Sequence, residues 1–118
     1  MTARVAFVAA DLPFGVAANA LAHVALGFAT LGAPSGSEPA PIVLTANSRL
    51  ATLRRQARAA GAAVVDFTAG MTGETWVEQL ARMAALPEAE QRYYALAIAG
   101  PAPLIESLVA QADAEAAA

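Results

Sequence analysis

The chain has 118 residues, of which 58% are hydrophobic and 14% are charged, and its net charge is −3. The length predicts one domain over residues 1–118, and the apolar share exceeds the ~45–50% of typical soluble domains, which indicates surface buried against another subunit. The absence of cysteine excludes disulfides and thiolate metal sites, and the absence of lysine excludes Schiff-base chemistry. With a single histidine as well, we expect no metal and no other cofactor.

The first segments predict a strand followed by a long helix. Val5–Ala10 is a continuous apolar run typical of a strand buried on both faces, and Pro13 suits the first turn of a helix that extends to about residue 31. Residues 16–33 are nearly all apolar, but their length and two polar side chains favour a buried helix over a membrane span. Because no signal-peptide pattern begins the chain, we expect a cytoplasmic location.

The rest of the chain continues the alternation of strands and helices. After a loop rich in proline, strands are predicted at 42–44, 62–67 and 93–99, and helices at 49–60, 75–85 and 103–112. Helices between strands imply crossover connections and a largely parallel sheet. The pattern therefore predicts an α/β fold, a three-layer α/β/α sandwich with four strands.

Polar side chains follow the ends of two predicted strands, where α/β sheets bind ligands. Asp11 follows the first strand, and Asp66 and Thr68 end the third. Asn19 and His23 are four residues apart, so they share one face of the first helix. Since a carboxylate can orient an imidazole as a general base, we expect these side chains to converge on a small polar pocket.

Each of these residues also has a structural interpretation. Asp11 can satisfy amides at a helix N-terminus, and Asn19 and His23 can be hydrogen-bonded core residues. Asp66 and Thr68 can belong to a turn.

Other site classes lack their signatures. There is no Gly-x-Gly-x-x-Gly after the first strand, no Walker loop and no Gly-x-Ser-x-Gly elbow. Arg54, Arg55 and Arg58 gather on the second predicted helix, where a phosphate contact is conceivable but a solvated face is favoured. Together with the acidic net charge, this argues against nucleic acid as a partner.

Three segments, in the same order, resemble a bacterial domain-of-unknown-function family (number two thousand). They are Val8–His23, Val64–Thr68 and Tyr94–Pro101. That family is similar in fold to the type II peptidyl-tRNA hydrolases. The resemblance implies a four-stranded mixed sheet between helices, in which strand four runs antiparallel to the others.

The resemblance to these hydrolases also implies site residues. The matching positions are Asp11-Leu12, His23, the loop Ala69–Thr72 and Gly100-Pro101. Thr72 thereby joins the candidate pocket. Thr68, however, stands where the hydrolases have aspartate, and the lysine at the start of their first helix has no counterpart here. The resemblance thus implies the fold, with an incomplete hydrolase site.

Three functions remain open on this basis. We expect a small-molecule binding or regulatory domain whose pocket uses Asp11, Asn19, His23 and Thr72 without making or breaking a bond. The first alternative is a hydrolase of peptidyl-tRNA or a related ester or amide. The second is a homo-oligomeric interaction protein, which the apolar excess favours. A homodimer is compatible with all three.

Overall fold

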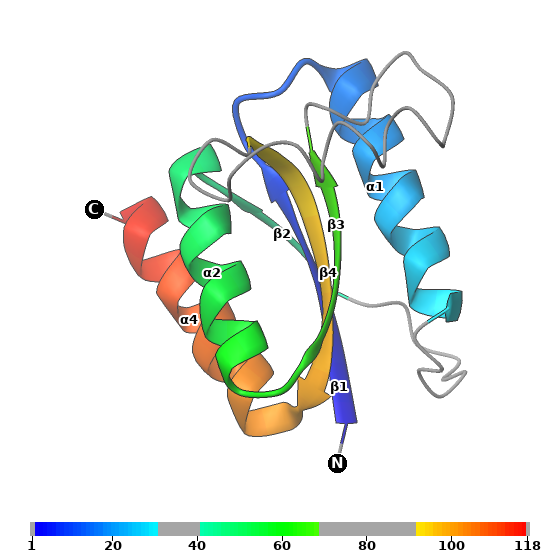
Figure 1. The fold of residues 1–118 in the computed structure, drawn as a ribbon. Helices are drawn as coiled ribbons and strands as arrows, with labels where there is room; N and C mark the ends of the chain where they lie inside the picture. Colours follow the sequence, from blue (N-terminus) through cyan, green and yellow to red (C-terminus); the bar gives the residue numbers. More distant parts are fainter. Residues whose placement is uncertain (1, 31–40, 69–91, 118) are drawn as a thin grey trace.

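The computed structural model describes residues 2–30, 41–68 and 92–117. The elements within them occur in the order β1 (Thr2–Ala9), α1 (Phe14–Thr30), β2 (Ile42–Thr45), α2 (Asn47–Ala59), β3 (Ala63–Thr68), β4 (Tyr93–Pro101) and α4 (Ala102–Ala117) (Figure 1). All seven were predicted from the sequence, with boundaries that differ by a few residues. The helix expected at 75–85 and the candidate residue Thr72 lie outside the described residues.

The strands form one mixed sheet in the order β2-β1-β4-β3. β1 and β2 are parallel, whereas β4 is antiparallel to both of its neighbours, β1 and β3. The reversed fourth strand implied by the family resemblance is therefore confirmed. The largely parallel sheet expected from crossovers is wrong, because alternation of strands and helices fixes neither the order nor the direction in which a strand enters the sheet.

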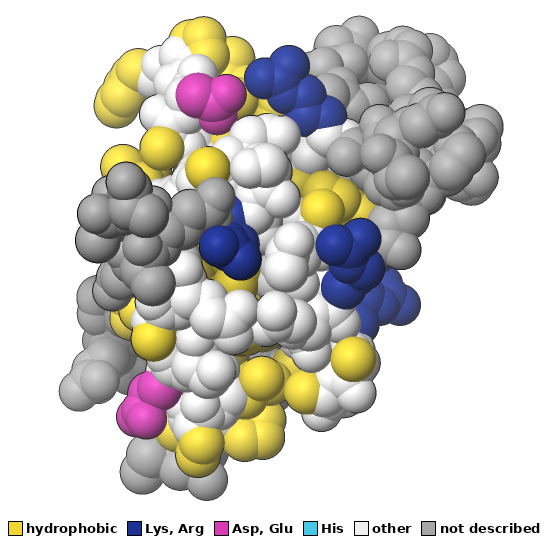
Figure 2. All heavy atoms as spheres, turned by 90° about the vertical axis from the view of Figure 1, so that its left-hand side faces the viewer, with side chains coloured by type: hydrophobic (Ala, Val, Ile, Leu, Met, Phe, Trp, Pro, Cys, Tyr) yellow, Lys and Arg dark blue, Asp and Glu magenta, His cyan; other side chains and the backbone are white. Residues whose placement is uncertain are grey.

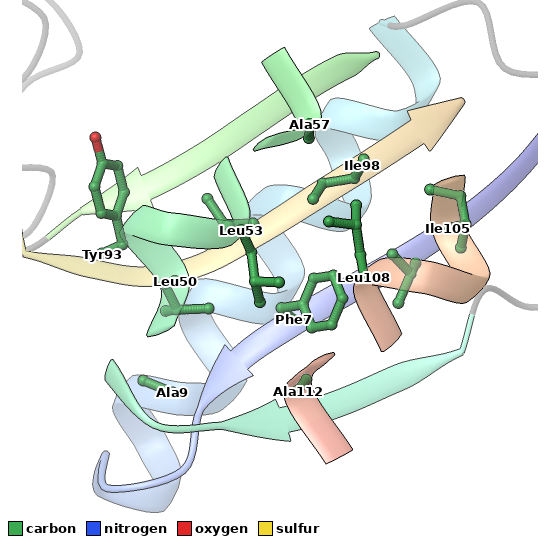
Figure 3. Packing of buried hydrophobic residues seen from close by; sticks show 12 residues of the cluster. Phe7, Ala9, Leu50, Leu53, Ala57, Tyr93, Ile98, Ile105, Leu108 and Ala112 are labelled. Carbon is green, nitrogen blue, oxygen red and sulfur yellow. The ribbon is translucent and has the colours of Figure 1, made fainter. Parts of the chain in front are cut away.

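Helices cover both faces of this sheet, with α1 on one side and α2 and α4 on the other (Figure 1). The layer beneath α2 and α4 contains the large core side chains Phe7, Leu53, Ile98 and Leu108 (Figure 3). The layer beneath α1 is built mainly from alanine and valine around Phe67. Because both faces are covered, β1 and β4 are apolar at successive positions rather than at alternate ones.

Close packing brings α1 onto the end of the sheet formed by β3. A Cβ on Gly27 would stand 2.5 Å from Cγ1 of Val65, so the lack of a side chain at residue 27 permits the approach. Ala20 and Val24 of the same helix are fully buried against the sheet. The helix expected from the sequence is present over residues 14–30, but it packs on the sheet through one face and is not buried all round.

Within the part of the chain that the structure describes, no helix combines the length and the apolar character needed to cross a membrane.

Candidate functional site

The structure divides the candidate residues between the two faces of the sheet. Asp66 faces α2, where its Oδ2 accepts a hydrogen bond from Nε of Arg54 at 2.7 Å. Its neighbours Val65 and Phe67 pack beneath α1 instead, as expected from the alternation of side chains along a strand. The expected convergence of Asp66 with His23 is therefore not observed.

Thr68 also lies on the α2 side. It pairs across the sheet with Tyr93, which belongs to the core beneath α2 and α4. The side chain is fully buried, and its hydroxyl has no hydrogen-bond partner. Thr68 is thus separated by the sheet from the helix that carries His23, so it does not share a pocket with that residue.

The arginines of α2 do not present one common surface. Arg54 is bound to Asp66, and its guanidinium lies 5.4 Å from the centre of the Tyr93 ring. Arg55 and Arg58 are exposed. Figure 2, which looks onto the α2 and α4 side, shows the basic side chains as separate patches divided by other residues. This dispersal fits the solvated-face interpretation.

His23 lies on the opposite side of the sheet, on α1. Its ring centre is 4.6 Å from that of Phe67, and its Nδ1 is 3.0 Å from the backbone oxygen of Asn19. Because a carbonyl oxygen can only accept, Nδ1 carries the hydrogen of this bond. The neutral ring then keeps the lone pair on Nε2 as an acceptor. Both Asn19 and His23 are exposed, so neither is a core residue.

A series of contacts continues from His23 across this face to the end of β1. The Phe67 ring centre lies 6.3 Å from that of Tyr94, and the guanidinium of Arg92 lies 5.9 Å from the Tyr94 ring centre. Nη2 of Arg92 is in turn 3.7 Å from Oδ2 of Asp11. We call these five residues the imidazole–guanidinium strip. Phe67 is buried and Tyr94 half-buried, whereas the other three are exposed.

A β-bulge places Tyr94 in the strip. Phe67 pairs with Ala95 and Thr68 with Tyr93, so Tyr94 has no partner residue on β3. Tyr93 packs beneath α2, and Tyr94 packs beneath α1. The two adjacent tyrosines thus face opposite sides of the sheet, as neighbouring residues of a strand do.

Sequence reasoning did not assign Phe67, Tyr94 or Arg92 to the site. The sequence did contain a signal of an aromatic and cationic surface at the start of β4, namely the adjacent residues Arg92, Tyr93 and Tyr94. Which of the two tyrosines it would include depended on the bulge, and a bulge has no signature in this stretch of sequence.

The strip offers recognition chemistry rather than an assembled catalytic group. It combines a hydrogen-bond acceptor at Nε2 of His23, a phenol, a guanidinium and a carboxylate. The two carboxylates expected beside the imidazole are engaged elsewhere, Asp11 with Arg92 and Asp66 with Arg54. Among the described residues, no cluster of histidine, aspartate and glutamate could hold a metal ion.

Comparison with known proteins identifies the family. Residues 33–113 match the family described as "Protein of unknown function (DUF2000)". No curated protein matches this sequence. A solved structure of a protein of unknown function, Atu0240 from Agrobacterium tumefaciens strain C58, superposes with a TM-score of 0.83 at 10% identity, covering 92% of this chain and 93% of that chain. At this identity the likeness shows the fold alone. The family match covers well over half of the sequence and confirms the family predicted from it: the chain belongs to the DUF2000 family of proteins of unknown function.

Proposed function

We propose that the protein is a small-molecule binding or regulatory domain whose site is the imidazole–guanidinium strip. The observation that supports this is the unbroken series of contacts from His23 to Asp11 on one face of the molecule. The exposed end groups supply polar recognition, and the half-buried ring of Tyr94, which packs against the buried Phe67, supplies apolar surface between them. Such a combination, apolar surface with a few placed polar groups, is typical of small-molecule sites.

The end groups of the strip define the ligand that would fit. Nε2 of His23 accepts a hydrogen bond, so the ligand presents a donor there. Arg92 presents a planar guanidinium, which matches a carboxylate or phosphate. Its present contact with Asp11 is long, at 3.7 Å, and both side chains are more than half exposed, so a ligand anion can compete for it. The ligand is therefore a small anionic molecule that also carries a hydrogen-bond donor.

Binding without chemistry fits this arrangement better than hydrolysis does. A histidine base is normally oriented by a third group, and among the described residues the hydrogen-bond partner of the His23 ring is the backbone oxygen of Asn19. Asp66 stands on the other face of the sheet. We also propose, as the sequence led us to expect, that the scaffold is similar to that of the type II peptidyl-tRNA hydrolases and that the protein is cytoplasmic.

The experiment titrates the protein with a panel of small carboxylates and phosphates while the imidazole signals are recorded by NMR. Because the chain has one histidine, those signals are assigned without ambiguity. We expect at least one compound to shift the Nε2 resonance and to raise Tm, and expect both effects to be lost in His23→Ala and Arg92→Gln.

The control is Arg55→Gln, which removes an exposed arginine from the opposite side of the sheet. This variant should bind as the unmodified chain does. If no compound in the panel moves the imidazole signals, or if the shifts persist in both strip variants, the proposal is wrong.

Self-association is the second candidate function, and exposed apolar side chains favour it. Phe14, Leu26, Ile42 and Leu44 are between 57% and 89% exposed. Sedimentation velocity at micromolar concentration tests it, and a monomer throughout would remove its support. Three of the four residues, Phe14, Ile42 and Leu44, border one groove. The size of that groove favours a small molecule over a second copy of the chain, as argued below.

A further inference from the structure

The α1 side of the molecule contains a second feature, separate from the strip, which we call the α1–β2 groove. It has a volume of about 520 Å³ and is lined by ten residues, all with apolar side chains. Phe14 contributes from the start of α1, and Ile42 and Leu44 contribute from β2. These three side chains are 89%, 57% and 62% exposed.

The groove exists because α1 does not cover the whole sheet. α1 packs chiefly on β1, β3 and β4, so that among the described residues no helix packs extensively on this face of the outer strand β2. Val43 points to the other side and packs against the core beneath α2 and α4. A sheet face that no helix covers normally carries polar residues at these alternating positions. Ile42 and Leu44 are thus apolar although both side chains are more than half exposed.

The dimensions of the groove fit a small molecule better than a second copy of the chain. A standard protein interface uses roughly 20–30 residues on each side. Here ten residues line the surface, and four of them are alanines. Pairing of two chains along the β2 edge is also hindered, because the strand has only four residues and follows Pro41. The volume, by contrast, lies within the range of about 300–1,000 Å³ found for ligand pockets.

The lining also selects the chemistry of the occupant. None of its side chains can donate or accept a hydrogen bond, so a charged or strongly polar group would lose water without compensation. Contact with aliphatic and aromatic carbon would instead be favourable. We infer that the α1–β2 groove is a binding site for an uncharged, largely hydrocarbon small molecule or acyl chain.

The test uses two probes that share one carbon skeleton. N-phenyl-1-naphthylamine is uncharged, and 1-anilinonaphthalene-8-sulfonate adds a sulfonate to the same rings. We expect the uncharged probe to bind saturably, with one molecule per chain and enhanced fluorescence, and the sulfonate to bind at least tenfold more weakly. Ala18→Trp, which fills the groove from α1, should abolish binding of the uncharged probe.

Ala22→Trp is the matched control. It places the same side chain one turn along α1 at an exposed position outside the groove, and it should leave binding unchanged. Circular dichroism of both variants verifies that they fold. The inference is overturned if the uncharged probe fails to saturate, if the sulfonate binds equally well, or if Ala18→Trp binds as tightly as Ala22→Trp. It is also overturned if sedimentation shows a dimer that Ala18→Trp dissociates, because a second copy would then occupy the groove.

Discussion

Arg54 and Asp66 form a short charged contact between α2 and β3. The 2.7 Å hydrogen bond joins side chains that are 17% and 15% exposed, and the Arg54 guanidinium also lies near the Tyr93 ring. In such a partly buried pair, removing one charge takes a favourable electrostatic contact from the other in a poorly solvated position. Asp66 therefore holds a helix to the sheet, which explains its presence without a catalytic role.

Asp66→Asn is expected to lower the free energy of unfolding by about 1–3 kcal/mol, because the amide cannot replace the charge-assisted bond. Urea unfolding followed by circular dichroism measures the change. Arg55→Gln, at an exposed position on the same helix, should stay within about 0.5 kcal/mol of the unmodified chain. Equal stability of Asp66→Asn and Arg55→Gln would show that the ion pair does not hold α2 in place.

At the scale of elements, α1 depends on a residue with low helix propensity. Gly27→Ala would place a methyl group 2.5 Å from Cγ1 of Val65. Although alanine favours a helix by about 1 kcal/mol relative to glycine, the overlap forces α1 away from β3 and should give a net loss of about 1–3 kcal/mol. Thermal unfolding measures the difference.

Gly15→Ala supplies the comparison within the same helix. No heavy atom lies within 4 Å of a Cβ built at that position, so only the propensity effect remains. The variant should gain about 0.5–1 kcal/mol, and Val65→Ala should restore part of the stability that Gly27→Ala loses. A stabilising Gly27→Ala would mean that α1 has room to shift on the sheet.

The elements were predictable because their signals are local. The apolar run of β1, the proline at the start of α1 and Gly61 after α2 each mark a boundary within a few residues. The position of β4 between β1 and β3 was not predictable from alternation, since it depends on long-range pairing. The face to which Asp66 points was not predictable for the same reason, because it depends on which side each helix covers.

In the whole molecule, the sheet separates two apolar layers of different character. The layer beneath α2 and α4 contains leucine, isoleucine and phenylalanine, whereas the layer beneath α1 is mostly alanine and valine. Both proposed sites lie on the α1 side, the strip toward β3 and the groove toward β2. The layer beneath α1, which has the smaller side chains, thus carries both proposed sites. The layer beneath α2 and α4, which has the larger side chains, supplies more of the buried apolar area.

Because β1 and β4 contribute side chains to both layers, we expect the two layers to unfold together. Leu53→Ala, beneath α2, should lower the free energy of unfolding by about 2–5 kcal/mol, and Val24→Ala, beneath α1, by about 2 kcal/mol. In both variants the urea transitions followed by circular dichroism and by methyl NMR signals should coincide. The dependence of the unfolding free energy on urea concentration should be unchanged. If Val24→Ala instead unfolds in two steps, α1 detaches before the sheet and its other helices do. The strip and the groove, which both depend on α1, would then be lost while the rest of the fold persists.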